Sequence, residues 1–251
     1  MNSRSDDTLI EIINRHLINK SYYNDRSYDV IHPSSLGYCI RKPVFDTMYI
    51  PTFSEPDPRI LRVFDNGHAV HNRLEKYFDG CEILIQPELV LDYAPLNISG
   101  RTDSLIRINN VYSLVEIKSM KDSSFTWMVR QGKPSESFYN QIQLYMFLIN
   151  CLYQEQYGLI TTGWILCENK DTQHMKGYAV WYDEATIQKL ISDIILVNKC
   201  VVSGNIPHVE HDHTKFPCRW DGGGCDYYEF CVFEDGNKQL SDNWPKQPVL
   251  F

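Results

Sequence analysis

The stretch DSLIRINNVYSLVEIKSM, residues 103–120, reads as two strands joined by a tight turn. Apolar residues recur on both sides of Asn109-Asn110, and asparagine tolerates the positive φ angles that a two-residue hairpin turn requires. Ile108 then faces Val111, and counting outward gives the further pairs Ile106–Ser113, Leu105–Leu114 and Ser104–Val115. The stretch therefore predicts an antiparallel β-hairpin with a defined register.

The next pair of this hairpin carries two negative charges. Asp103 lies directly opposite Glu116, with Cβ atoms about 5 Å apart on one face, where like charges destabilise a sheet unless a cation lies between them. Because side chains alternate along a strand, Lys118 shares the face of Glu116 and Ile117 points to the other face. The pattern predicts two carboxylates and an ammonium group at one end of the hairpin.

These residue types suit metal-assisted chemistry. Mg²⁺ and Mn²⁺ prefer carboxylate oxygens, and a bound divalent ion activates water and stabilises charge on a phosphoryl oxygen. A neighbouring lysine can orient the water or offset the negative charge that develops. From this stretch alone, a site for phosphodiester cleavage and a surface hairpin with solvated charged ends are equal alternatives.

Two helical patterns flank the hairpin. Residues 58–78, PRILRVFDNGHAVHNRLEKYF, predict a helix in which Gly67 allows close approach to a neighbour and His71 lies at the edge of an apolar stripe made of Ile60, Phe64, Val70, Leu74 and Tyr77. Glu75, one turn after His71, could orient the imidazole. Residues 137–154, SFYNQIQLYMFLINCLYQ, predict an amphipathic helix on which Gln141 and Tyr145 are neighbours.

In order and spacing, these motifs resemble the PD-(D/E)xK nucleases of the RecB-like branch. The resemblance covers residues 34–231 and rests on His71, Asp103, Glu116-Ile117-Lys118 and Gln141-x-x-x-Tyr145. It implies an α/β fold with a mixed central sheet flanked by helices, a metal site formed by His71, Asp103, Glu116 and the Ile117 carbonyl, a water-activating Lys118, and Gln141 and Tyr145 as positioning residues. The stretch before Asp103, Ser-Gly-Arg-Thr, departs from the proline-led version of the motif.

Eight cysteines divide into two groups. The N-terminus MNSRSDDTLI has no apolar signal segment, which favours a reducing cytosol over a disulfide-forming compartment. Four cysteines lie in apolar or helical surroundings and are expected to pack as small hydrophobic residues: Cys81, Cys151, Cys167 and Cys200.

The other four cysteines form a candidate cofactor site. Cys218, Cys225 and Cys231 fall in the glycine-rich stretch PCRWDGGGCDYYEFC, and Cys39 lies near the start of the chain in HPSSLGYCIRKPVF. Four thiolates can bind either zinc or an iron-sulfur cluster, and the Cys-x-x-Cys pairs typical of zinc sites are missing here. The arrangement is similar to the iron-sulfur staple of RecB-like nucleases, including CRISPR-associated adaptation nucleases and AddB, which implies a 4Fe-4S cluster; structural Zn²⁺ is the alternative.

Charge distribution is compatible with DNA as the partner. The net charge is −8, but acidic and basic residues balance between residues 41 and 133, and the acidic excess lies after residue 134. Cationic side chains favour phosphate contacts. The candidates for DNA binding are Arg41, Arg73, Lys121 and Lys170, with Lys42, Arg59, Arg62, Arg130 and Lys133 as further basic residues nearby in the sequence.

The length of 251 residues and an apolar content of 43% predict one domain with a substantial core, which the resemblance implies is a nuclease domain. The expected parts are a catalytic core at 34–210, the cysteine staple at 39 and 218–231, and a tail at 232–251. Helices are expected at 7–18, near residue 39, at 58–78, 137–154 and 183–202, with strands at 82–92, 98–108, 111–118, 161–170 and 175–183. No apolar run is long enough to span a bilayer.

The sequence therefore predicts a Mg²⁺- or Mn²⁺-dependent DNA exonuclease that acts on ends or single strands, in recombination, repair or replication, in a bacterial or phage-infected cytoplasm. A sequence-specific or structure-specific endonuclease and a non-catalytic DNA-binding subunit of a larger complex are the alternatives. The last residues, Gln247–Phe251, resemble short peptides that dock on sliding clamps, although folding back onto the core is the simpler interpretation. The pattern does not fix the oligomeric state or the polarity of digestion.

Overall fold

In the computed structural model of the chain, the described residues are 7–21, 29–50, 57–208, 212–220 and 223–233. At its centre lies a sheet in the order β1-β2-β3-β4-β5, with bounds Leu84–Tyr93, Ile98–Ile108, Val111–Met120, Thr162–Asn169 and Met175–Trp181. Strands β3 and β4 are parallel, and the other neighbouring pairs are antiparallel. The predicted mixed sheet is confirmed.

The hairpin of β2 and β3 has the predicted turn and register. Asn109 and Asn110 have φ angles of 50° and 64°, which asparagine adopts more readily than most residues. The ladder runs from Ile108↔Val111 outward and ends at Ser104↔Val115. Asp103 therefore lies just beyond the last ladder pair, where its side chain is free to reach along β3 instead of simply facing Glu116.

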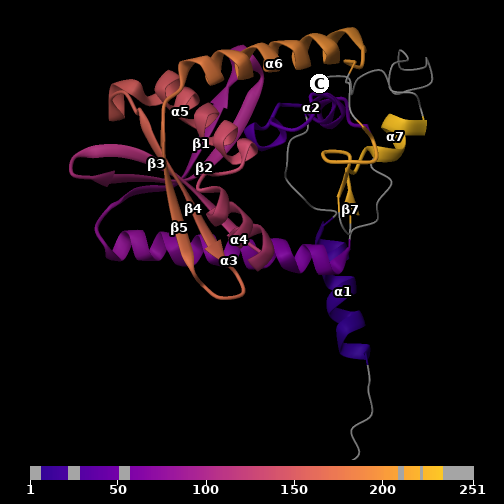
Figure 1. Cartoon of the computed structure of the whole chain (residues 1–251), viewed down its shortest axis with the longest axis horizontal. Coiled ribbons are helices and arrows are strands. Elements are labelled where there is room, and N and C mark those ends of the chain that lie inside the picture. The colour runs from indigo at the N-terminus through magenta and orange to yellow at the C-terminus, as the bar shows by residue number, and fades with distance from the viewer. Residues whose placement is uncertain (1–6, 22–28, 51–56, 209–211, 221–222, 234–251) are drawn as a thin grey trace, which may run out of the picture.

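Helices cover both faces of the sheet (Figure 1). On one face, α3 (Pro58–Gly80) packs Val70 and Leu74 against Ile106, Val115 and Ile117. On the other face, α5 (Glu136–Tyr157) and α6 (Glu184–Ser203) build the larger apolar core around Leu105, Leu114 and Ile165. The alternation along β3 thus directs Ile117 to α3, whereas Leu114 faces α5, as expected for a strand that is buried on both sides.

Close packing occurs at Gly100, and not at Gly67 as predicted. A Cβ added at Gly100 on β2 would lie 2.9 Å from Tyr145 Cε1 and 3.0 Å from Pro33, so this site admits no larger residue without movement. A Cβ at Gly67 on α3 would meet nothing within 4 Å, and the close approach expected there is wrong. Phe64 and Tyr77, 59% and 54% exposed, are also not part of the buried stripe of α3.

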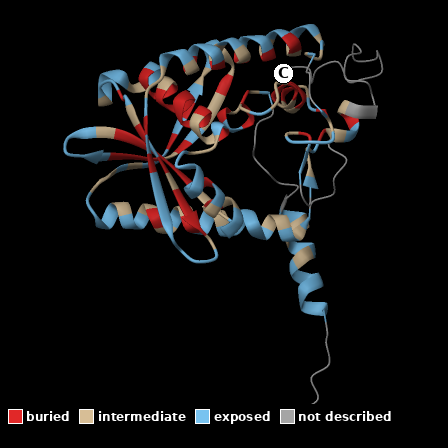
Figure 2. Cartoon of the chain, in the orientation of Figure 1, coloured by how far each residue is buried: buried red, intermediate tan, exposed pale blue. Residues whose placement is uncertain are grey.

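The remaining elements lie around this core. They are α1 (Thr8–Ser21), η1 (Pro33–Ser35), α2 (Arg41–Thr47), η2 (Ala94–Leu96), α4 (Asp122–Gln131), β6 (Arg219–Trp220), β7 (Gly223–Gly224) and α7 (Tyr228–Phe233). A small apolar cluster joins α2 to the C-terminal segment through Phe45, Ile50, Tyr227 and Phe230. Burial is concentrated where the sheet meets α5 and around α2, whereas α1 is largely exposed (Figure 2). None of the helices in the described segments combines the length and apolarity that a bilayer crossing needs.

Candidate active site

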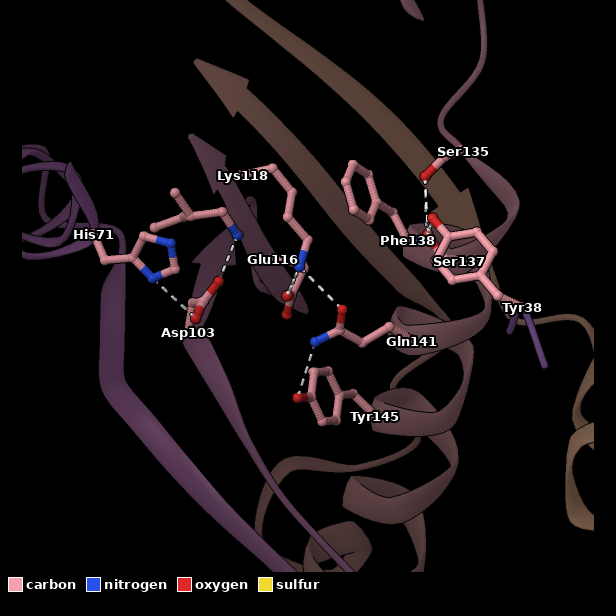
Figure 3. A network of polar contacts seen from close by, with 11 residues as sticks. Tyr38, His71, Asp103, Glu116, Lys118, Ser135, Ser137, Phe138, Gln141 and Tyr145 are labelled. Carbon is pink, nitrogen blue, oxygen red and sulfur yellow. Dashed lines mark hydrogen bonds and ion pairs between the residues drawn. The ribbon is translucent and has the colours of Figure 1, made fainter. Parts of the chain in front are cut away.

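Asp103 is held between a helix and a strand (Figure 3). Its Oδ2 accepts a hydrogen bond from the backbone amide of Ile117 at 2.6 Å, so the carboxylate reaches past Glu116 along β3. Its Oδ1 lies 3.2 Å from Nδ1 of His71 on α3. The structure therefore brings His71, Asp103 and the Ile117 backbone together, and the imidazole contacts Asp103 directly, where Glu75 had been considered as its orienting group.

Glu116 is the most buried charged group of the site. Only 3% of the residue is exposed, and its Oε1 accepts a 2.7 Å hydrogen bond from Nζ of Lys118. Its Oε2 is buried and has no hydrogen-bond partner among the described residues. Burial raises the pKa of Glu116 to about 7, with Lys118 opposing the increase and Asp103 adding to it. An unsatisfied buried carboxylate oxygen is costly, so this atom needs a proton or a cation.

Helix α5 holds the ammonium group from the other side. Lys118 Nζ donates to Gln141 Oε1 at 3.0 Å, and Gln141 Nε2 donates to the Tyr145 hydroxyl at 3.1 Å. The same Nζ lies 4.8 Å from the ring centre of Phe138, a cation–π contact that was not predicted. The available signal was helical spacing, since Phe138 precedes Gln141 by three residues and shares its face.

The electrostatics favour the charged forms of Lys118 and His71. Burial lowers the pKa of Lys118, but the charge and hydrogen bond of Glu116 raise it by more. In His71, burial likewise lowers the pKa, and the hydrogen bond and charge of Asp103 outweigh that effect, so the net shift is upward. Burial and the two carboxylates raise the pKa of Tyr145, whose hydroxyl therefore stays neutral. The cluster can stabilise negative charge and hold a water, and Lys118 cannot act as a base while it is protonated.

The predicted metal ligands meet in space without forming a finished coordination set. No group of three or more His, Cys, Asp or Glu side chains in the described segments is arranged to hold a metal ion. The donor types nevertheless fit a hard divalent cation, because the Oε2 atom of Glu116 is unpartnered beside a second carboxylate, that of Asp103. Side-chain movement would be needed for both carboxylates to reach one ion.

The four predicted DNA-binding residues have different surroundings. Arg41 is 3% exposed and donates from Nε to the Pro207 carbonyl at 2.8 Å, so its position does not suit a phosphate contact. Arg73 donates to the buried Glu168 at 2.5 Å, which occupies part of its guanidinium. Lys121 and Lys170 lie together at the carboxyl ends of β3 and β4, where the Lys170 amide donates to Met120. That these two lysines contact DNA stays a prediction.

The four cysteines predicted to bind a cofactor lie in one region, but in the described segments no three of them are arranged to hold a metal ion. Burial raises the pKa of Cys218, and the thiols of Cys39 and Cys225 add to the increase. Burial raises the pKa of Cys231 to about 11, an effect that Arg41 reduces and that Cys39 and Cys225 increase. Residues far apart in the sequence thus meet beside α2, and Cys225 and Cys231 pack on its apolar cluster. The nature of any cofactor there stays a prediction.

Two further expectations have different outcomes. Cys167 and Cys200 are buried as expected, but Cys81 and Cys151 are exposed, so the prediction that all four pack as small hydrophobic residues is wrong for these two. Cys81 follows the end of α3, where the chain turns towards β1 on the surface. The suggested clamp-docking peptide, Gln247–Phe251, lies outside the described residues.

No family model and no curated protein sequence matches the chain. Among solved structures, the alkaline exonuclease LHK-Exo from Laribacter hongkongensis is similar with a TM-score of 0.50 and 10% identity, over 70% of this chain and 89% of that chain. SSO0001 is similar with a TM-score of 0.48 and 20% identity, over 75% of this chain and 86% of that chain. A phage-related exonuclease from Haemophilus somnus is similar with a TM-score of 0.46 and 12% identity, over 70% of this chain and 96% of that chain. The chain therefore has a mixed α/β fold similar to that of an exonuclease.

Proposed function

We propose that this protein is a metal-dependent DNA exonuclease of the PD-(D/E)xK superfamily, RecB-like branch, that hydrolyses phosphodiester bonds at DNA ends or in single strands. One observation carries the proposal: Asp103, Glu116 and Lys118 converge, and the Oε2 of Glu116 is buried with no partner in the described segments. The similarity in fold to an alkaline exonuclease supports it. Roles in recombination, repair or replication follow from the family resemblance.

Asp103, Glu116, His71 and the Ile117 carbonyl would hold Mg²⁺ or Mn²⁺. When bound, the ion supplies a Lewis acid for the phosphoryl group and lowers the pKa of the attacking water. Asp103, fixed by the Ile117 amide, orients one side of the site, and Glu116 supplies its unpartnered oxygen.

Lys118 has two tasks in this mechanism. Its ammonium group stays charged beside Glu116 and can donate to the attacking water or to a non-bridging phosphate oxygen. Gln141 holds the ammonium group through Oε1, and Tyr145 accepts from the Gln141 amide, so α5 fixes the direction in which Lys118 points. Lys121 and Lys170, at the same end of the sheet, would contact the phosphates that flank the scissile bond.

The second part of the proposal is that Cys39, Cys218, Cys225 and Cys231 bind a 4Fe-4S cluster that ties the two ends of the chain together. The placement of the four cysteines in one region beside α2 supports it, because Cys39 and Cys225 act on the pKa of both Cys218 and Cys231. When bound, the cluster contributes folding energy. Structural Zn²⁺ on the same ligands is the alternative, distinguished by iron and sulfide analysis.

The activity is tested with DNA labelled at one end. Linear single-stranded and double-stranded DNA and covalently closed circles are incubated with Mg²⁺, with Mn²⁺ or with EDTA, beside Asp103→Asn purified in parallel. We expect metal-dependent release of nucleotides from linear DNA while closed circles survive. Cleavage of the circles would instead identify an endonuclease, and binding without cleavage by the wild-type protein would identify a non-catalytic DNA-binding subunit.

A further inference from the structure

A polar contact joins Tyr38 to the helix that carries the lysine-binding residues (Figure 3). The hydroxyl of Tyr38 hydrogen-bonds the hydroxyl of Ser137, a residue 7% exposed in the first turn of α5. Ser137 also lies 3.2 Å from the hydroxyl of Ser135, which caps α5 by accepting from the amide of Phe138. The contact therefore reaches the cap of α5 from a segment almost a hundred residues earlier in the sequence.

The backbone beside Tyr38 also lies against α5. Gly37 has a φ of +127°, and a Cβ added there would lie 3.2 Å from the Cα of Ser137. A larger residue would be strained in this conformation and would press on the helix. The segment that carries Tyr38 is therefore fitted to the first turn of α5, and the hydroxyl contact has little freedom to shift.

The first turn of α5 is also the part that holds Lys118. Phe138 follows Ser137 directly, and its ring centre lies 4.8 Å from Lys118 Nζ. Gln141, one turn further along, accepts from the same nitrogen at 3.0 Å. A change in the position of this turn would move both groups together, and the ammonium would lose two of the three contacts that direct it, keeping only Glu116.

On its other side, Tyr38 contacts the cysteine region. Its ring packs edge-to-face on Phe216 with centroids 4.9 Å apart, and Phe216 lies two residues before Cys218. Tyr38 itself precedes Cys39. The ring thus bridges both cysteine-bearing segments, while the hydroxyl bridges to α5. Half of the residue, 49%, is exposed, so the bridge lies at the surface between the two regions.

We propose that Tyr38 is a positioning residue for DNA cleavage: through its hydrogen bond to Ser137 it fixes the first turn of α5, from which Phe138 and Gln141 direct the ammonium of Lys118. The inference rests on the proposed nuclease function. Through its contacts with Phe216 and Ser137, Tyr38 would make the position of Lys118 depend on how the cysteine region is packed.

The test is a double-mutant cycle of Tyr38→Phe and Ser137→Ala. Tyr38→Phe keeps the ring on Phe216 and removes only the hydroxyl. We expect each single variant to lower kcat about fivefold with an unchanged KM for DNA, and the double variant to be no slower than the single ones, since both remove one contact. Tyr139→Phe is the matched control, because Tyr139 lies in the same turn but donates to Asp183.

A second measurement does not depend on activity. In protein labelled at lysine side chains, the ring of Phe138 shifts the NMR signal of the Lys118 Cε protons, and Phe138→Leu identifies that signal. Tyr38→Phe should move it towards the position seen in Phe138→Leu, and Tyr139→Phe should leave it in place. If the wild-type protein cleaves no DNA, the proposed function fails, and this signal still tests whether Tyr38 positions Lys118.

Three results would overturn the role of Tyr38. In the first, Tyr38→Phe has wild-type kcat and an unmoved Lys118 signal. In the second, KM for DNA rises while kcat is unchanged, which would mean that the exposed side of Tyr38 contacts DNA. In the third, the losses in the two single variants multiply in the double variant, which would mean that the hydroxyls of Tyr38 and Ser137 act independently.

Discussion

The candidate active site gathers charged side chains of opposite sign, whereas the cysteine region gathers thiols, and burial raises the pKa of Cys218, Cys225 and Cys231. In the first, Lys118 neutralises Glu116 and His71 lies on Asp103. In the second, the pKa of Cys218 is raised by burial and by the thiols around it. The secondary structure that carries the two groups also differs. The charged cluster lies on the central sheet, whereas the thiols lie on short elements around α2.

The difference indicates what each region would gain from the metal proposed for it. In the candidate active site, Lys118 pairs with Glu116 and His71 with Asp103, so the site would fold without an ion, and the ion proposed at the unpartnered Glu116 Oε2 would serve chemistry. In the described part of the cysteine region, β6 and β7 are only two residues long each, so a bound cluster would contribute to its folding. The predictions below test this contrast, from the largest expected effect to the smallest.

The largest effect is expected for Asp103→Asn. Asparagine keeps the shape of the side chain but removes the negative charge that a divalent ion requires, so cleavage of end-labelled DNA should fall by at least about 100-fold. The melting temperature without metal should be equal or higher, since removing one of two neighbouring carboxylates relieves repulsion. Full cleavage by carefully purified Asp103→Asn would show that Asp103 is not needed for the chemistry. Failure of this variant to fold would show that Asp103 is needed for folding.

Cys39→Ala should have the opposite pattern, a structural loss that comes before any catalytic one. Without the N-terminal ligand the cluster should be lost, with iron absent from the purified protein and the melting temperature lowered by about 10 °C. Cys81→Ala is the control, because Cys81 is exposed beyond the end of α3. Equal iron content and melting temperature in the two variants would show that Cys39 is not a ligand.

A moderate effect is expected for two glycines of the active-site region. In Gly100→Ala, the new methyl group would lie about 3 Å from Tyr145 and Pro33, and this overpacking should lower the melting temperature by about 5 °C. Gly67→Ala should raise it by about 2–4 °C, because open space surrounds that helical position and alanine favours helix. Thermal unfolding followed by circular dichroism measures both, and the same sign of change in the two variants would contradict the packing described.

The smallest effect concerns pH. Because burial raises the pKa of Glu116 to about 7 from an ordinary value of 4.5, the folded state binds this proton more tightly than the unfolded state. The stabilisation is therefore present below pH 4.5 and is lost as the pH rises through about 7. Glu116→Gln should be more stable than the metal-free wild type at pH 8 and should lose that advantage at pH 4.

Added Mn²⁺ should raise the melting temperature of the wild type at pH 8, since the cation can replace the missing proton on Glu116. It should leave Glu116→Gln unchanged. A Mn²⁺ response of equal size in both variants would place the ion at another site.

The sequence was sufficient for the hairpin because local chemistry determines it. Asn109-Asn110 fix the turn, and the alternation of apolar residues fixes the register up to Ser104↔Val115. The same local rule did not reveal that the Asp103 carboxylate binds the Ile117 amide, because that contact depends on how β2 leaves β3 beyond the ladder. Pairing rules describe a regular ladder and give no information at its end.

Long-range packing accounts for most of what the sequence did not predict. Phe138 and Ser137 lie on a helix whose apolar face was evident, but their link to Lys118 and Tyr38 requires the placement of α5 on the sheet. Arg41 was assigned to DNA from its charge alone, and its burial beside Pro207 and Cys231 follows only from the docking of the C-terminal segment on α2. Charge predicts a surface position only where no buried partner exists.

The central claim, that Asp103 and Glu116 hold a divalent ion for DNA cleavage, is tested most directly by anomalous diffraction from crystals soaked with Mn²⁺ and a cleavage-resistant oligonucleotide. We expect an anomalous peak within coordination distance of Glu116 Oε2, an Asp103 oxygen and the Ile117 carbonyl, with a phosphate oxygen on its open side. Ordered DNA in the crystal with Mn²⁺ bound elsewhere, and Glu116 Oε2 still without a ligand, would contradict it.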